Sequence, residues 1–502
     1  MSFHEVKLHP SRKVNIRVLA IANLLSGLIY GFYNVIIQPF LVELIELTGR
    51  QVQPEETLGM IMTVASVVQI IPMIFASKIS DKIGRKRVIL GSFIFLPISM
   101  VLLGTSGLLS VNYPLHFYSL GANFPLESVT LSKLVVKGFP ITYALAVAFL
   151  GLSCTSLGFG LGDPANSALV AESAEEKKTA SSFSIISLAF YATGLVGPLV
   201  IRVLTNKIDL WVYFYILAVL RLVMFIYQLF ALKESQVVKD YTSNIYKQFI
   251  QSLKAIYLML LQMFKSIFLY LSIPYYLIKR KQQSERSNYY NEVETNLNLF
   301  KEIFRNPGVP YAVGFFLLDA LVYGISLSIF WGSLVTQYDF NEGNIAVIQL
   351  VFNISTLIFF IPVTKISDKL KKRELLLISQ LTGGLFFASN IIAYFTLPQF
   401  RFYIIMIGWI GMGASVAFWM PGIMSILTNF DKKRRAETYG MVQGLHQVGW
   451  FPTSFLAGLI ISRVNFLMVF VISMVLFPFI ILMAWKFPVK EDMEEELEED
   501  KA

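Results

Sequence analysis

Charged residues, cysteine and histidine are all scarce in this 502-residue chain. Only 15% of its residues are charged and 55% are hydrophobic, whereas a soluble domain carries about 25% charged residues. The excess apolar side chains must therefore face lipid. The single cysteine, Cys154, excludes a disulfide framework or a cysteine-rich metal site. The four histidines are too scattered to form a metal cluster, so we expect neither a metal nor a cofactor.

The hydrophobic residues fall into long runs that predict an all-α membrane protein. A helix needs about 20 apolar residues to cross the hydrocarbon core. We identify twelve such runs, near residues 17–42, 57–77, 88–110, 140–162, 180–203, 210–232, 309–335, 345–364, 374–396, 402–424, 439–462 and 464–486. The first run is too long for a cleaved signal peptide.

The positions of the basic residues orient these twelve spans. Lys and Arg outnumber Asp and Glu, which gives a net charge of +9, and they gather in the short loops after spans two, four, eight and ten. Because basic loops mark the cytoplasmic side, both termini and residues 233–308 are predicted to be cytoplasmic. The chain is then a multi-pass protein of the cell membrane. The charge orients the chain, and we do not expect a nucleic-acid partner.

The chain repeats itself, which predicts two six-helix bundles. Residues 78–83 (KISDKI) recur as 365–370 (KISDKL), and residues 27–31 (GLIYG) match 320–324 (ALVYG). Parallel repeats of this kind place a binding site near the membrane midplane, between the halves. We therefore divide the chain into a first bundle at 1–232, a cytoplasmic linker at 233–308, a second bundle at 309–487 and an acidic cytoplasmic tail at 488–502.

The loop after span two carries a recognisable signature. Residues 77–86 (SKISDKIGRK) resemble the motif G-x-x-x-D-[RK]-x-G-[RK]-[RK] of the major facilitator superfamily (MFS), and they depart from it only at the leading glycine. The resemblance implies a transporter whose loop latches the cytoplasmic side shut against residues 437–440. The residues of this gating motif are Asp81, Lys82, Gly84, Arg85 and Lys86, with Asp368 and Lys369 in the second copy. The alternative is that these cations only set the topology.

Polar side chains share one helical face in three of the spans. Because a polar stripe facing lipid would be costly, we expect these stripes to line the cavity between the halves. The predicted site residues are Ser26, Tyr30, Tyr33 and Asn34 in span one, Asp319, Tyr323 and Ser326 in span seven, and Gln443, His446 and Gln447 in span eleven.

Three of the ionisable residues within spans are candidates for function. In this span map Asp319 is the only acid well inside a span, and an ionisable group at that depth is a functional hypothesis by default. It is either a proton or cation site, or a structural ion-pair partner. His446 either titrates near neutrality or is a satisfied polar group. In this map no acid lies within the first-half spans away from their ends. The partner of Arg221 in span six is therefore Asp319 across the interface, a substrate anion or backbone carbonyls, or its role is structural.

The linker contains an amphipathic segment at residues 246–278. Lys247, Lys254 and Lys265 share one helical face, which is the pattern of a helix lying in the membrane interface. A re-entrant pair of helices is the alternative. Basic residues at 279–281 favour an anionic inner leaflet as the lipid partner.

The predicted function is secondary active transport of a small organic solute by alternating access, with proton coupling at Asp319. An uncoupled facilitator and a non-transporting membrane sensor or scaffold are the alternatives. Span four contains no basic residue, unlike many proton-coupled drug exporters of the family that the chain resembles. An enzyme is not expected, because we find no nucleophile with a base, no metal-ligand spacing and no phosphate-binding loop. We expect a monomer.

Overall fold

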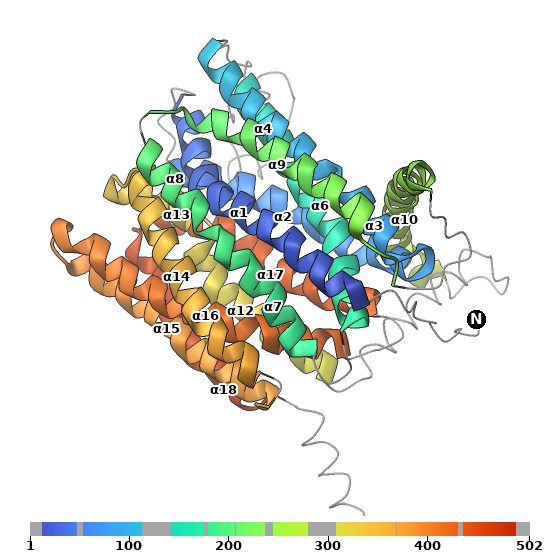
Figure 1. Cartoon of the computed structure of the whole chain (residues 1–502). Coiled ribbons are helices and arrows are strands. Elements are labelled where there is room, and N and C mark those ends of the chain that lie inside the picture. Colours follow the sequence, from blue (N-terminus) through green and yellow to red (C-terminus); the bar gives the residue numbers. More distant parts are fainter. Residues whose placement is uncertain are drawn as a thin grey trace, which may run out of the picture.

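The computed structural model describes residues 13–47, 54–112, 142–174, 179–205, 207–235, 244–279, 308–367, 369–429 and 435–487. The regular structure of these residues is helical, and the helices of the first half (blue to green) lie beside those of the second half (yellow to red) in Figure 1. The first half contains α1 (Asn15–Glu46), α2 (Pro54–Ile83), α3 (Arg85–Phe93), α4 (Phe95–Asn112), α6 (Tyr143–Ser173), α7 (Thr179–Gly194), α8 (Val196–Leu204) and α9 (Leu210–Ala231). The linker helix is α10 (Ile245–Lys279), and the second half contains α12 (Gly308–Leu327), α13 (Phe330–Tyr338), α14 (Glu342–Ile366), α15 (Lys372–Phe395), α16 (Pro398–Asn429), α17 (Arg435–Arg463) and α18 (Leu467–Trp485).

Apolar runs form helices here because lipid offers no hydrogen bonds, so each backbone group must bond within its own segment. Eleven stretches of the described residues are long and apolar enough to cross a membrane. Three of them each join two consecutive helices, namely α3 with α4, α7 with α8, and α12 with α13. The twelfth predicted span is α17, whose internal polar residues lower its hydropathy. The fold is therefore the predicted all-α arrangement of twelve membrane helices in two six-helix bundles.

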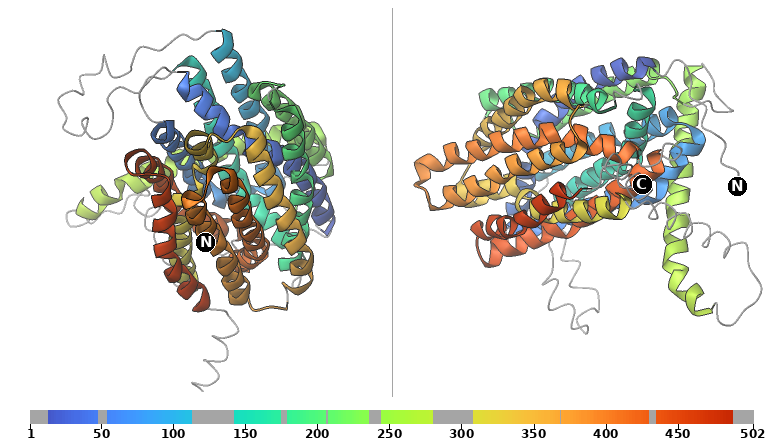
Figure 2. Two further views of the ribbon diagram at one scale, coloured as in Figure 1. Left: turned by 90° about the vertical axis from the view of Figure 1, so that its left-hand side faces the viewer. Right: turned by 90° about the horizontal axis from the view of Figure 1, so that it is seen from below.

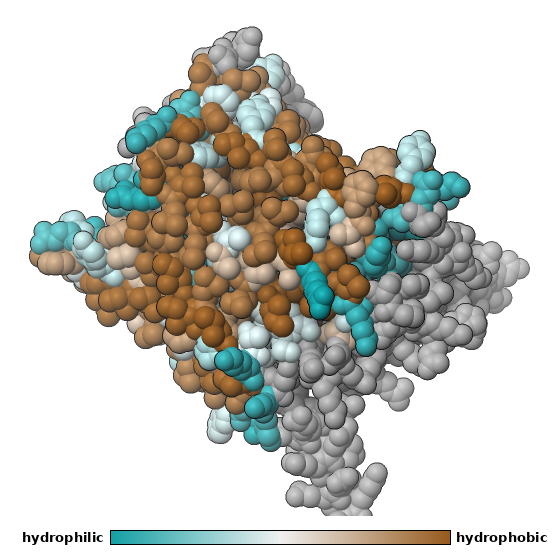
Figure 3. Space-filling view, viewed as in Figure 1, coloured by the Kyte–Doolittle hydropathy of each residue, from teal (hydrophilic) through white to brown (hydrophobic). Residues whose placement is uncertain are grey.

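The outer surface of the bundle is apolar, as a lipid-facing surface must be. Figure 3 shows one continuous face of hydrophobic residues, with hydrophilic side chains toward its edges. Large side chains on this surface are strongly exposed, among them Val203, Val219 and Ile358. An apolar patch of this extent on a water-exposed protein would be an interaction or aggregation surface.

The linker helix α10 does not run with the others. It lies across one end of the bundle, nearly perpendicular to the spanning helices (Figure 2, right), and it packs against α3 and α2. Its exposed residues include Tyr246, Tyr257 and Phe268. The helix thus exists over nearly the predicted range, and its location in the membrane interface stays a prediction.

The break between α12 and α13 frees backbone groups that the other half satisfies. The Gln38 side chain of α1 donates from Nε2 to the carbonyl oxygen of Ser328 at 2.9 Å, and the Gly332 N–H donates to Gln38 Oε1 at 2.9 Å. One side chain of the first half therefore bonds both sides of the helix break in the second half.

Candidate functional site

The loop signature builds a capped helix N-terminus at the predicted cytoplasmic end of the bundle. Gly84 has φ +104°, a conformation that disfavours any residue with a Cβ. The turn exposes the first N–H groups of α3, and Glu234 accepts from Arg85 N at 2.8 Å and from Lys86 N at 3.1 Å. Burial raises the pKa of Glu234, and these N–H donors oppose that rise. A Cβ at position 84 would also meet the Glu234 carboxylate.

Arg85 is the centre of an ion-pair network inside the first half. Its side chain is only 1% exposed, and Nη2 lies 2.6 Å from Asp81 Oδ1 and 2.7 Å from Glu172 Oε1. Ser80 accepts a further hydrogen bond at 2.7 Å. A buried guanidinium is tolerated when several acceptors surround it, and this network ties the end of α2 to the end of α6.

Lys86 connects the same loop to the linker helix. Its Nζ donates to the Leu229 carbonyl oxygen at 2.9 Å and to Gln248 Oε1 of α10 at 2.7 Å. These partners of Arg85 and Lys86 come from the first half and from α10. The predicted latch contact with residues 437–440 stays a prediction, because the Glu437 side chain lies outside the described part of the chain.

The second copy of the loop is built differently. Lys371 stands where the first copy has Gly84, with φ −62°, and its N–H donates to Glu374 Oε2 at 3.1 Å within the same helix. Lys82 of the first copy and Lys369 of the second are both exposed, and Asp368 lies outside the described residues. The second copy therefore caps its helix locally.

A cavity of about 480 Å³ lies between the halves. Met420 and Tyr439 come from the second half, and the other lining residues come from the first. These residues occupy each helix from its middle to the end that the charge pattern places in the cytoplasm. The lining residues used below are Ser26, Tyr30, Phe159, Asp163, Asn166, Phe190, Arg221 and Gln228.

Arg221 of α9 is buried against this cavity at 3% exposure. Its guanidinium carbon lies 5.1 Å from the Tyr30 ring centre and 5.9 Å from that of Phe159, and it hydrogen-bonds to the Tyr30 side chain. It also interacts electrostatically with Asp163 of α6. The expectation that the first half holds no acid near Arg221 is therefore wrong. Helix α6 continues through Pro164 to Ser173, whereas the predicted span stopped at residue 162.

Asp319 lies in the second half, away from the cavity lining. It is 6% exposed, and Gln380 Nε2 donates to its Oδ1 at 3.0 Å. His446 Nε2 lies 3.3 Å from Asp319 Oδ2, while Trp450 Nε1 donates to the same His446 nitrogen at 3.1 Å. Gln443 contacts the other ring nitrogen at 3.4 Å. The structure thus brings together Asp319, His446 and Gln443 as a buried polar cluster.

The remaining predicted site residues separate into two groups. In span one, Ser26 and Tyr30 line the cavity, Tyr33 packs edge-on against Tyr30 at 6.2 Å, and Asn34 is half-buried. In the second half, Tyr323 and Ser326 are buried beside Asp319 in α12, and Gln447 is half-buried. The expectation that the span-seven stripe lines the same cavity as the span-one stripe is therefore not met in this conformation.

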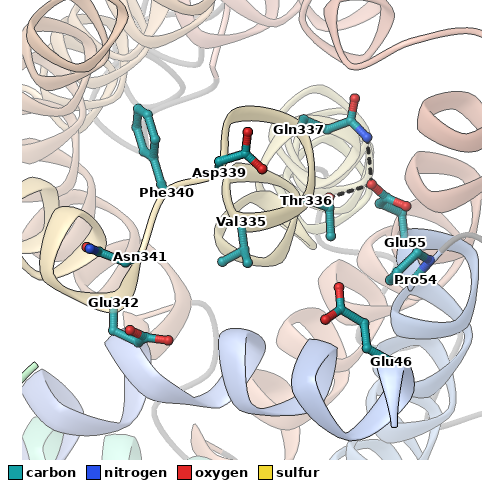
Figure 4. Close-up of a pocket in the computed structure, with 10 residues that line it drawn as sticks. All are labelled: Glu46, Pro54, Glu55, Val335, Thr336, Gln337, Asp339, Phe340, Asn341 and Glu342. Atoms are coloured by element: carbon teal, nitrogen blue, oxygen red, sulfur yellow. Dashed lines mark hydrogen bonds between the residues drawn. The ribbon is translucent and has the colours of Figure 1, made fainter. Parts of the chain in front are cut away.

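At the opposite end, the two halves bond to each other. A second pocket, of about 660 Å³, is lined by Glu46, Glu55, Asp339 and Glu342 among others. Figure 4 shows the side chains that line it. Glu55 of α2 accepts hydrogen bonds from Gln337 Nε2 at 2.7 Å and from the Thr336 hydroxyl of α13. Together with the Gln38 contacts, these bonds hold the halves together on the predicted outer side.

Twelve membrane helices in two bundles, with a polar cavity between them, are the architecture of known transporter folds. The chain matches the Major Facilitator Superfamily model over residues 19–397 and 311–502, and it belongs to this family. A search of curated proteins finds no match. The family and fold suggested by the loop signature are therefore confirmed.

Solved transporters share this fold at low sequence identity. The xylose transporter XylE from E. coli, in a partially occluded inward open conformation, aligns with a TM-score of 0.60 and 14% identity over 95% of this chain and 98% of its own. The human organic anion transporter MFSD10 aligns with a TM-score of 0.57 and 14% identity over 95% of this chain and 100% of its own. Identities this low show the fold alone.

Proposed function

We propose that the protein is a secondary active transporter that moves a small organic solute across the cell membrane by alternating access. The observation that carries this proposal is the asymmetry between the two ends of the bundle. The cavity between the halves occupies the predicted cytoplasmic side, while Gln38 and Glu55 bond the halves together on the outer side. Rocking the halves would break these bonds beside the outer pocket and open the site to the outer side.

The Asp319–His446 pair is the proposed proton site. A lone pair on His446 Nε2 accepts the Trp450 N–H, whereas a proton on Nε2 would be donated to Asp319. Without a proton on Nε2, the 3.3 Å contact with Asp319 is a hydrogen bond only if the carboxyl carries the proton. The presence or absence of a proton on Nε2 therefore determines whether His446 donates to Asp319 or accepts from Trp450. The hydrogen bonds of the cluster thus depend on where its protons lie.

Structures of the same fold include transporters of small solutes, and one of them is proton-coupled. One of them is a proton:xylose symporter bound to 6-bromo-6-deoxy-D-glucose, with a TM-score of 0.58 and 14% identity over 94% of this chain and 96% of its own. MFSD10 is an organic anion transporter. For this chain we propose a monomer with both termini in the cytoplasm, and with α10 lying on an anionic inner leaflet.

Flux in proteoliposomes tests the coupling. The purified protein is reconstituted with an entrapped pH dye, and xylose, phenylalanine, 3-phenylpropionate and 2-phenylethylamine are added in turn, with and without an imposed pH gradient. Coupled transport predicts that a transported solute moves with protons and that the gradient accelerates its uptake. Asp319→Asn should remove the acceleration while downhill exchange of the same solute continues.

Asp209→Asn is the matched control, because Asp209 is an exposed acid at the start of α9. It should keep the wild-type response. Equal acceleration in wild type and Asp319→Asn would remove Asp319 from the coupling. Solute flux that ignores the gradient in the wild type would identify the uncoupled facilitator, and absence of any flux across a broad solute screen would favour the non-transporting sensor.

A further inference from the structure

The cavity between the halves holds two opposite charges that do not pair with each other. Arg221 and Asp163 both line it, and they interact electrostatically. Within the described residues, however, they form no ion pair within 4.0 Å, and the Asp163 carboxylate makes no hydrogen bond. Keeping two charges apart in a low-dielectric interior is costly unless something compensates them. The structure therefore presents a guanidinium and a carboxyl group to the same space.

Further polar atoms of the lining are buried without a hydrogen-bond partner among the described residues. They are Arg221 Nε, Gln228 Oε1 and Asn166 Oδ1. A buried polar group that bonds to nothing costs about 1–3 kcal/mol, so three around one cavity indicate a surface built for a polar ligand. One of these atoms is a donor of the Arg221 guanidinium itself, and the other two are acceptors.

Aromatic side chains form much of the remaining wall. Tyr30 lies between Phe159 and Phe190, with ring centres 5.8 Å and 5.3 Å away. Tyr191 continues the wall and packs edge-on against Phe190 at 5.1 Å. Such a surface accommodates an apolar or aromatic body between the polar groups.

We propose that this cavity binds a zwitterionic solute of the amino-acid type. Its carboxylate would accept from Arg221 Nε, and its ammonium group would donate to Asp163 and Asn166. A neutral polyol would leave both charges uncompensated, and a simple anion or amine would compensate one. Only a solute with both charges matches the separated pair. The inference takes the solute cavity from the proposed function, but it concerns binding and not transport.

Ligand binding to the purified full-length chain tests this inference. The probes are phenylalanine, 3-phenylpropionate, which lacks the amine, 2-phenylethylamine, which lacks the carboxylate, and xylose, which is neutral. Titration calorimetry in detergent should show phenylalanine binding at least tenfold more tightly than either singly charged probe, because each charge-assisted hydrogen bond adds about that factor. Equal affinity for 3-phenylpropionate and phenylalanine, or tighter binding of xylose, would overturn the assignment.

Two variants give a crossed pattern that a general loss of structure could not produce. Arg221→Gln should weaken phenylalanine at least tenfold and leave 2-phenylethylamine unchanged. Asp163→Asn should weaken phenylalanine and leave 3-phenylpropionate unchanged. Lys207→Gln and Asp209→Asn remove exposed charges outside the cavity and should bind all four probes as the wild type does. If both cavity variants lower the affinity for every probe equally while their thermal unfolding is unchanged, Arg221 and Asp163 do not recognise the two charged groups of the solute.

Binding and flux separate this inference from the proposed function. The crossed binding pattern without flux of any solute would leave the zwitterion site standing and contradict transport. Flux of xylose with no flux or binding of phenylalanine would support transport and refute the zwitterion site.

Discussion

The two halves of this chain cap the helix after their basic loop in different ways. Each has a basic loop that leads into a helix, and each helix must satisfy its first N–H groups. In the first half the cap is Glu234, which is 149 residues from Arg85 in the sequence. In the second half the cap is Glu374, three residues from Lys371. The first loop is therefore part of the tertiary structure, while the second is a self-contained helix start.

The same contrast applies to the charges inside the membrane. Arg221 and Asp163 in the first half face a cavity without pairing, whereas Asp319 in the second half is closed in by Gln380 and His446. This contrast fits the two roles proposed above, in which the first half binds the solute and the second half binds the proton. The two halves share the repeated loop sequence, and their buried polar residues differ.

The largest expected effect comes from replacing Arg85, the centre of the ion-pair network in the first half. Arg85→Met should lower the free energy of unfolding by about 3–5 kcal/mol, because it leaves the Asp81 and Glu172 carboxylates without their buried cation. Thermal unfolding in detergent measures this loss of stability. Unfolding is monitored by the reaction of a thiol dye with Cys154, the only cysteine of the chain.

Lys82→Met and Lys369→Met are the matched controls for this change. Both remove an exposed cation from the corresponding loop of one half, so each should shift stability by less than about 0.5 kcal/mol. If Arg85→Met were as mild as these two, the first loop would be no more structural than the second.

A smaller effect distinguishes the two caps directly. Glu234→Ala should cost about 2–4 kcal/mol, because it leaves the Arg85 and Lys86 N–H groups unpaired in a buried site. Glu374→Ala should cost about 0.5–1 kcal/mol, since Glu374 is exposed and water can replace it. Chemical unfolding of the two variants side by side tests the difference. Equal losses would mean that the distant cap is no stronger than the local one.

Much of the architecture could be predicted from the sequence. Apolar runs predict the spans because every membrane helix must reach a minimum length, and the repeated KISDK loop predicts the two halves. Asp163 was missed because the predicted fourth span ended at residue 162. Membrane helices tolerate proline, since neighbouring helices and local side chains satisfy the freed backbone groups, and α6 runs on to Ser173.

The partners of the first loop could not be predicted. Nothing near Gly84 in the sequence indicates that Glu234 will cap the next helix, because the contact depends on where α9 ends in space. The same holds for Gln38, whose side chain reaches the break between α12 and α13. Sequence patterns predict which residues are polar and buried, and tertiary packing decides which of them meet.

A further small effect concerns how firmly the first half holds the linker helix. Gln248→Leu removes one of the two acceptors of Lys86 Nζ and keeps the other, the Leu229 carbonyl oxygen. We expect a loss of about 1 kcal/mol, since one hydrogen bond to a charged group is replaced by water at a partly exposed position. Hydrogen exchange should then increase about fivefold in α10, with α15 of the second half unchanged. Lys254→Gln, an exposed position on the same helix, should leave α10 as it is. Unchanged exchange in Gln248→Leu would mean that apolar packing against α3, not the loop, holds the linker helix to the first half.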